Sequence, residues 1–305
     1  SLENITIPFV GASPTVTDGY AQVFGYIFGY TKSSSDSVSG ATYQYSYYYN
    51  YATTYYYHYY IPTSIRTVKV TSGNIPSNAF FNCNELTNII ISDSVTSIGK
   101  YAFKDCAGLT NVTIGNSVTS IDYQAFYGCS RLTSITIPDS VTSIGYQAFK
   151  DCAGLTNVTI GNSVTSIDYQ AFNGCSRLTI IDYTGDVVGW CGISGLSGLM
   201  LMLKLKPALY IGDNKVEGDL VIPDGVTSIG EYAFYGCSGL TSVTIPDSIT
   251  SIGSGAFFDC TRLTSIYYTG DVVGWCGLSG PGTIMSSSRT LYIGGNKVEG
   301  DLVIP

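Results

Sequence analysis

The chain has 305 residues, of which 12% are charged, and its formal net charge is −8. An acidic chain with so few Lys and Arg residues argues against binding to a nucleic-acid backbone or to an anionic membrane surface. No apolar run reaches the roughly 18 residues that a membrane-spanning helix needs. The nearest one, GLMLMLKLK at residues 198–206, alternates and predicts a short strand. We therefore expect neither a nucleic-acid partner nor membrane insertion.

The N-terminal segment LENITIP, residues 2–8, predicts a strand that is followed by a long irregular stretch. Within this stretch lies ATYQYSYYYNYATTYYYHYY, residues 41–60, in which eleven of twenty residues are tyrosine. The alternation favours two paired strands, and Tyr offers a large contact area with a hydroxyl group. The segment is therefore either a cover over neighbouring structure or a partner-binding patch. The candidate binding residues are Tyr47, Tyr48, Tyr49, Tyr55, Tyr56 and Tyr57.

From about residue 65 the chain is built from units of 23 residues. The same step separates Leu86, Leu109, Leu132, Leu155 and Leu178, and also Cys83, Cys106, Cys129, Cys152 and Cys175. In the unit LTSITIPDSVTSIGYQAFKDCAG, the segment ITI alternates like a strand, and Pro138 ends it. VTSI predicts a second extended piece, and YQAFKDC predicts a helical turn. Because one coil cannot bury its apolar side alone, the units must stack.

This unit resembles the treponema-type leucine-rich repeat of BspA-like surface proteins. The resemblance rests on the TIP or TIG strand end, the SVTSIG segment and the Ala-Phe-x-x-Cys turn, which recur with interruptions from about Ile65. It implies an α/β repeat solenoid, that is, a leucine-rich-repeat horseshoe or superhelix. Parallel strands would line its concave side, with short strands and helical turns elsewhere. It also implies an exported bacterial surface or secreted protein that takes part in adhesion.

Two coils, which begin at Leu178 and Leu263, carry an added TGDVVGWCG segment and a later LYIG…KVEGDLVIP segment. Asp186 and Asp271 are placed to cap a short helix in each, and residues 211–220 predict a hairpin. The cysteine of each GWCG segment is expected to pack the added loop against the core. The chain starts and stops within the pattern. We expect one solenoid over residues 1–305, a fragment of a longer protein, with insertions at about 9–64, 183–216 and 268–298.

The sequence predicts no catalytic, metal-binding or cofactor-binding residue. Nine cysteines are an odd number without clustered ligands, which favours small buried free thiols over disulfides or a metal site. His58 is the single histidine, so histidine-dependent nucleophilic catalysis is disfavoured. Most carboxylates recur at equivalent turn positions, which indicates turn chemistry rather than an acid–base pair. Asp213, Glu217 and Asp219 could form a weak calcium site, although a solvated hairpin is the better interpretation.

The outward positions of the predicted strands carry mostly Thr, Ser and Asn. This ladder serves either solubility and strand formation or a flat surface for a protein or glycan. Larger side chains interrupt it at Lys69, Ile90, Asp182 and Tyr267, and we expect any specific contacts near them.

Together with the family resemblance, which implies adhesion and a location outside the cell or at its surface, these features favour a non-enzymatic, adhesin-like module. It would present its strand face and Tyr-rich loops to a protein or glycan partner. One alternative is a passive spacer in a larger surface protein. The other is a carbohydrate-active β-solenoid enzyme.

Overall fold

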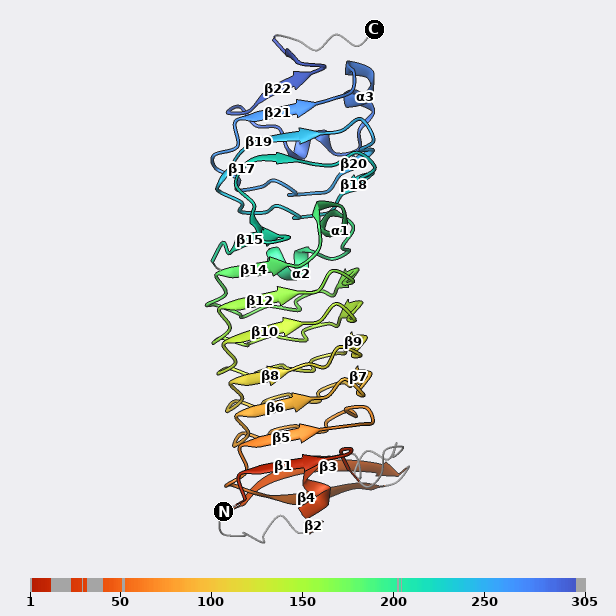
Figure 1. Ribbon diagram of the computed structural model, residues 1–305, viewed down its shortest axis with the longest axis vertical. Helices are drawn as coiled ribbons and strands as arrows, with labels where there is room; N and C mark the ends of the chain where they lie inside the picture. The colour runs from red at the N-terminus through yellow and green to blue at the C-terminus, as the bar shows by residue number, and fades with distance from the viewer. Residues whose placement is uncertain are drawn as a thin grey trace.

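The computed structural model describes residues 2–11, 23–28, 30–31, 41–50, 53–201, 203 and 205–299. Figure 1 shows an elongated column of stacked coils, with β1 near one end and β22 near the other. Each regular coil has three sides, named here the long-strand side, the short-strand side and the turn side. Within the described part of the chain, no helix is long and apolar enough to cross a bilayer.

The long-strand side consists of parallel strands whose side chains alternate between core and solvent. In β10, Ile135 and Ile137 are buried while Ser134 and Thr136 point outward. The strands of this side, in chain order, are β1 (Asn4–Ile7), β5 (Thr67–Val70), β6 (Asn88–Ile91), β8 (Asn111–Thr113), β10 (Ser134–Ile137), β12 (Asn157–Ile160), β14 (Ile180–Tyr183), β15 (Ala208–Ile211), β17 (Gly218–Val221), β19 (Leu240–Ile245), β21 (Ser265–Tyr268) and β22 (Thr290–Ile293).

The short-strand side carries strands of two residues that pair in parallel from coil to coil. They are β7 (Ser97–Ile98), β9 (Ser120–Ile121), β11 (Ser143–Ile144), β13 (Ser166–Ile167), β18 (Ser228–Ile229) and β20 (Ser251–Ile252). On the turn side, the segment predicted as a helical turn is a pair of tight turns. Each coil passes twice through left-handed backbone there, at Gln124 (φ 50°) and Gly128 (φ 73°) in one coil.

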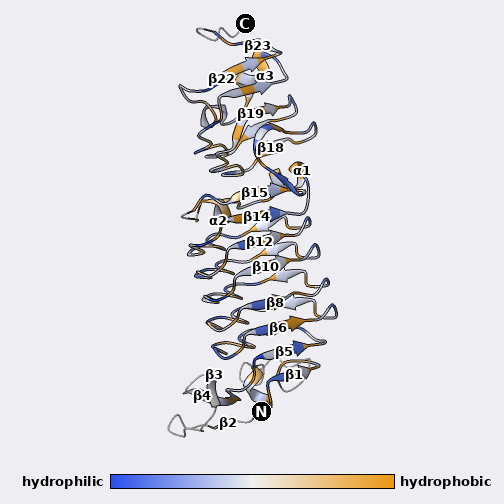
Figure 2. Ribbon diagram, turned by 60° about the vertical axis from the view of Figure 1, so that its left-hand side comes forward, coloured by the Kyte–Doolittle hydropathy of each residue, from blue (hydrophilic) through white to orange (hydrophobic). Residues whose placement is uncertain are grey.

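A stack of phenylalanine rings on the turn side determines the shape of the column. The rings of Phe80, Phe103, Phe126, Phe149 and Phe172 are buried, with neighbouring centroids 4.9–5.2 Å apart. Parallel strands are spaced by about 4.8 Å. The turn side and the long-strand side therefore rise by nearly the same distance per coil. As a result, the long-strand side is a nearly straight wall and not the inside of a horseshoe (Figures 1 and 2). The predicted parallel-strand solenoid is confirmed, with less curvature than expected.

The chain between β1 and β5 lies outside the long-strand sheet, since these two strands pair directly with each other. It contains the 3-10 helix η1 (Phe24–Phe28), β2 (Tyr30–Thr31), and the antiparallel hairpin of β3 (Ala41–Asn50) and β4 (Thr53–Pro62). Phe24 extends the ring stack, 5.0 Å from Phe80, and its N–H donates to the Ala79 carbonyl. The same bond joins regular coils, as from Phe80 to Ala102. Phe24 therefore occupies the position of a preceding coil.

Gln44 fastens the hairpin to this end of the solenoid. Its buried side chain accepts a hydrogen bond from the Gly25 N–H at 2.7 Å and donates to the Ala79 carbonyl at 2.9 Å. Tyr59 and Ile61 of β4 are also buried. The hairpin base is thus part of the packed structure.

The repeat is interrupted between β14 and β17. The helix α1 (Val187–Cys191) follows β14, and Asp186 caps it by accepting a hydrogen bond from the Gly189 N–H, as predicted. The helix α2 (Ser197–Met200) then replaces the Ala-Phe turn, and the Phe172 N–H donates to the Gly198 carbonyl. The predicted strand at residues 198–206 is therefore wrong, because its first residues supply this turn. The hairpin of β15 and β16 (Asn214–Lys215) completes the junction.

Trp190 joins the two parts of the column across this junction. Its buried indole Nε1–H donates to the carbonyl of Ala233 at 2.9 Å. In regular coils this carbonyl position accepts the N–H of a phenylalanine in the preceding coil, as Ala148 does from Phe126. The indole therefore replaces a backbone donor that the interrupted coil cannot supply. The second added segment repeats this architecture with α3 (Val272–Gly277), η2 (Pro281–Thr283), β22 and β23 (Asn296–Lys297).

Replacing Trp190 with Phe should lower the free energy of unfolding by about 1–3 kcal/mol, since the Ala233 carbonyl would be buried without a donor. Urea denaturation would measure the change. Trp275→Phe is the matched control, because the described residues offer its indole N–H no acceptor. Equal losses in the two variants would contradict the assigned role of Trp190.

Replacing Gln44 with Ala should loosen the hairpin base, because the Gly25 N–H loses its acceptor. Hydrogen exchange of residues 23–28 should become markedly faster, while exchange in the coils beyond residue 100 stays unchanged. Gln170→Ala, which removes a half-buried Gln on the turn side, is the control. Unaltered exchange at residues 23–28 would show that Gln44 does not hold the hairpin.

Candidate binding surface

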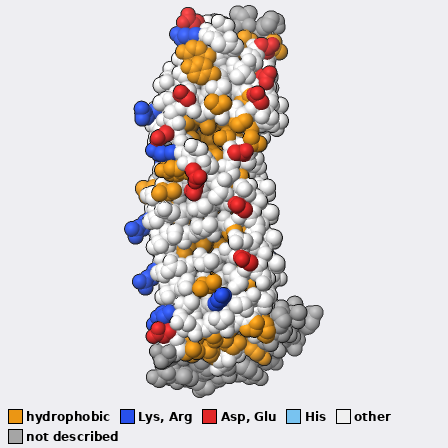
Figure 3. Space-filling view, in the orientation of Figure 1, with side chains coloured by type: hydrophobic (Ala, Val, Ile, Leu, Met, Phe, Trp, Pro, Cys, Tyr) orange, Lys and Arg blue, Asp and Glu red, His pale blue; other side chains and the backbone are white. Residues whose placement is uncertain are grey.

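The four interrupting side chains predicted on the strand face lie in one outward column. Lys69 is exposed and lies opposite half-buried Ile90 in the parallel register, so the structure brings these two together. Three threonines follow in the column before Asp182, which places Asp182 and Tyr267 well away from the first pair. Figure 3 shows most of the Lys and Arg side chains of this face along one edge, with Asp and Glu side chains spread over the rest of it.

The C-terminal part of this column carries Tyr210, Tyr267 and Tyr292, with Val221 and Thr244 between the first two. Tyr267 is 39% exposed, and its ring stacks on Tyr292 with centroids 4.7 Å apart. Asp182 lies opposite Tyr210 in the register, and partial burial together with Asp213 raises the pKa of its carboxyl group. Tyr210 and Tyr292 were not predicted as surface residues, although the duplicated LYIG segment carries the signal, since alternation directs its tyrosine outward.

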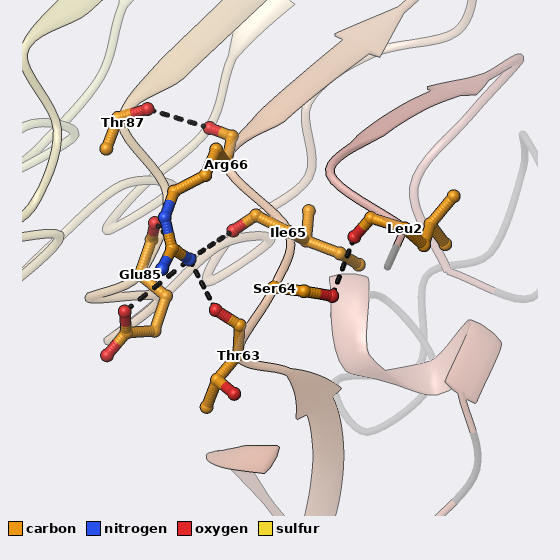
Figure 4. A network of polar contacts seen from close by, with 7 residues as sticks. All are labelled: Leu2, Thr63, Ser64, Ile65, Arg66, Glu85 and Thr87. Carbon is orange, nitrogen blue, oxygen red and sulfur yellow. Dashed lines mark hydrogen bonds and ion pairs between the residues drawn. The ribbon is translucent and has the colours of Figure 1, made fainter. Parts of the chain in front are cut away.

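An Arg66 network fixes the chain where it leaves the hairpin and enters the first regular coil (Figure 4). The Arg66 guanidinium donates to the Thr63 carbonyl and lies 3.6 Å from the Glu85 carboxylate. The Ser64 hydroxyl donates to the Leu2 carbonyl at 2.7 Å. Because Arg66 lies three residues before Lys69, the hairpin base and the Lys69–Ile90 pair are held on the same part of the column.

The six tyrosines proposed as a binding patch lie on β3 and β4. The register sets Tyr47 opposite Tyr56 and Tyr48 opposite Tyr55, so their backbones lie side by side. Tyr49 and Tyr57 belong to the same paired strands. The side chains of these tyrosines and of His58 lie outside the described residues. The predicted strand pair is confirmed for the backbone.

Aspartates at the ends of the long strands hold neighbouring coils together. Asp93 accepts a hydrogen bond from the Asn116 N–H at 2.7 Å, and Asp139 accepts one from the Asn162 N–H at 2.9 Å. Asp271 caps α3 as Asp186 caps α1. These contacts confirm the predicted turn and capping chemistry.

The hairpin carboxylates that could have formed a calcium site are engaged separately. Glu217 pairs with Lys215 at 2.5 Å, and Asp219 accepts a hydrogen bond from the Ser242 hydroxyl at 2.6 Å. Among the described residues, no group of three His, Cys, Asp or Glu side chains is placed to bind a metal ion.

Eight of the nine cysteines are buried, and all nine are free thiols. Several donate to a phenylalanine carbonyl of the preceding coil, as Cys129 does to Phe103 at 3.2 Å. Burial raises the pKa of the Cys106 thiol to about 12 and that of Cys260 to about 11. The expectation for the GWCG cysteines holds for buried Cys191, but Cys276 is exposed. The buried thiols therefore act as small packing groups that remain protonated.

The raised pKa values predict a loss of stability in alkali. In the unfolded chain the thiols ionise near pH 9, whereas in the folded chain Cys260 and Cys106 ionise near pH 11 and 12. The unfolded state therefore binds fewer protons in this window, so the free energy of unfolding should fall as the pH rises from about 9 to 12. Denaturation at a series of pH values would show the slope, and Cys106→Ala should reduce it.

The same burial predicts selective thiol labelling. At pH 8 a thiol reagent should modify one cysteine, Cys276, in the folded protein and all nine after denaturation. Rapid modification of several thiols in the folded state would contradict the packing described here.

Comparisons with known proteins gave several similar chains. The sequence profile of the BspA type leucine rich repeat region matches residues 73–188 and 214–273, in six copies. A solved leucine-rich repeat protein of T. pallidum is 24% identical, with 65% of this chain and 77% of that chain covered and a TM-score of 0.40. One from Bacteroides ovatus is 22% identical, with 85% and 78% covered and a TM-score of 0.38. A leucine rich cell surface protein of Faecalibacterium prausnitzii is 24% identical, with 79% and 89% covered and a TM-score of 0.28. The search of curated proteins gave no match.

Proposed function

Because the chain belongs to the BspA-type leucine-rich repeat family, we propose that it is a non-enzymatic binding module, at a bacterial cell surface or outside the cell. The observation that carries this proposal is how the strand-end carboxylates are used. Asp93 and Asp139 hold adjacent coils, and Asp186 and Asp271 cap helices, so each of these carboxylates uses one oxygen for the scaffold. A repeated scaffold with outward-facing side chains supports recognition rather than acid–base chemistry.

The binding surface would have two parts at the N-terminal end of the column. One is the tyrosine hairpin, whose base is fixed by Gln44. The other is the Lys69–Ile90 pair. At these two outward positions, where the following coils carry threonine, the chain has a cation beside an apolar side chain. Tyr and Trp rings that are held rigidly give contact area at low entropic cost. The partner would be a protein or a glycan on a matrix or another cell.

Asp182 and Tyr267, farther along the wall, would provide secondary contacts with the same extended partner. The nearly identical coils at residues 104–133 and 150–179, before Asp182, can repeat weak contacts and raise avidity. The elongated column in Figure 1 also suits a spacer that carries other domains. These two functions differ in whether surface substitutions change binding.

A solid-phase binding assay against a panel of host matrix proteins and glycans would test the proposal. Changing Tyr47, Tyr48, Tyr49, Tyr55, Tyr56 and Tyr57 together to Ser should weaken binding by about tenfold or more, which corresponds to a loss of about 1.4 kcal/mol. Lys69→Thr combined with Ile90→Thr restores the threonine ladder and should weaken binding severalfold.

Tyr169→Ser and Lys100→Thr are matched controls, since both change exposed residues outside the proposed surface. Circular dichroism and thermal melting would verify that each variant is folded. A folded protein that binds nothing in the panel, or that binds equally well in all variants, would favour the spacer.

A further inference from the structure

The long-strand sheet is interrupted between β8 and β10, two successive strands of otherwise regular coils. A surface hollow of about 470 Å³ lies at this interruption, and its lining includes Thr113, Asn116, Thr136, Pro138, Asp139 and Thr184. In several described coils, the residue after a long strand donates its N–H to the preceding coil, as Ser92 does to Val70 and Thr184 does to Ile160. Pro138 has no N–H and cannot make this bond to Ile114. Pro138 thus removes one possible bond across the opening, although Pro246 follows β19 while β19 still pairs with β17.

The opening is confined to one side of the coil. On the short-strand side, β9 and β11 remain paired, and on the turn side the rings of Phe103 and Phe126 are 4.9 Å apart. An additional peptide strand would need about 4.8 Å on each of its own sides. Since the other two sides keep the regular step, the gap cannot widen enough to admit a strand. Small polar groups of a ligand lying across the gap fit better than an inserted peptide.

The chemistry of the lining favours an uncharged polyol. Asp139 uses one carboxylate oxygen to accept hydrogen bonds from the Asn162 N–H and from the Thr184 hydroxyl, both at 2.9 Å. Its second oxygen has further acceptor capacity. The hydroxyl groups of Thr113 and Thr136 can both donate and accept. None of the described residues that line the space is Lys or Arg, so an anionic ligand would meet only the Asp139 carboxylate.

A second space adjoins the first at Thr184. It measures about 450 Å³ and is lined by Asn162, Tyr183, Thr184, Asp186 and neighbouring glycines. The Tyr183 hydroxyl donates to the Asn162 carbonyl at 3.0 Å, which fixes the phenol at its wall. The two spaces share Thr184, and their lining residues come from several coils; together they are named here the Thr184 trough. This extent suits an oligosaccharide better than a single sugar.

We propose that the Thr184 trough binds a neutral oligosaccharide through Thr113, Thr136, Asp139 and Thr184. This rests on the proposed binding function and assigns it a ligand class and a site separate from the tyrosine hairpin. Sugar hydroxyl groups lie across the gap between β8 and β10 and pair with the threonine hydroxyls and the Asp139 carboxylate.

The test is a printed array of neutral and acidic oligosaccharides, followed by calorimetric titration with the best neutral one. Binding should be to uncharged glycans, and Thr136→Val and Asp139→Asn should each weaken it by about tenfold. Thr159→Val and Asp247→Asn are matched controls, at the equivalent column and turn positions outside the trough, and should leave the affinity unchanged. Thermal melting would show that Thr136→Val is folded, since valine fits the volume of threonine.

The outcomes separate this inference from the broader proposal. Binding of neutral glycans that survives Thr136→Val and Asp139→Asn would overturn the assignment of the site, and binding of acidic glycans alone would overturn the ligand class. If no glycan binds while a matrix protein binds through the tyrosine hairpin, the trough proposal fails and the binding function stands. If neither binds, both fail.

Discussion

The structure depends on one constraint, that all three sides of a coil must rise by the same step. The ring stack on the turn side advances by about 5 Å per coil, close to the spacing of parallel strands. Backbone bonds such as Phe103 N–H to the Ala125 carbonyl repeat at each step. A polar atom is therefore free for function only where neither the core nor a neighbouring coil uses it.

Departures from the repeat are tolerated where a substitute completes the bonds between coils. Phe24 takes the place of a preceding coil at the N-terminal end, and the Trp190 indole replaces a backbone N–H at the junction. Each is supplied by a segment that lies outside the plain unit. The same segments bring new side chains to the surface, which is why insertions carry much of the variation available for recognition.

The sequence predicted the parallel solenoid, the outward column and the aspartate caps, because these follow from residue spacing and turn chemistry. It could not predict the straightness of the wall, which depends on the thickness of the turn side. Nor could it identify the role of Trp190, because its acceptor, Ala233, lies 43 residues away. The misreading of residues 198–206 has a similar origin: alternation alone cannot show that Gly198 stands where a regular coil has the alanine of its Ala-Phe turn.

The trough illustrates how a repeat protein can hold a unique site. The segment NVTIGN occurs at residues 111–116 and again at 157–162, yet β12 pairs on both sides while β8 pairs on one. The difference lies in the next coil, which brings Pro138 to β8 but Thr184 to β12. The two identical segments thus have different surroundings, because the coils next to them differ. Specificity in such a protein is therefore a property of adjacent coils taken together, and a search that scores each unit alone would overlook it.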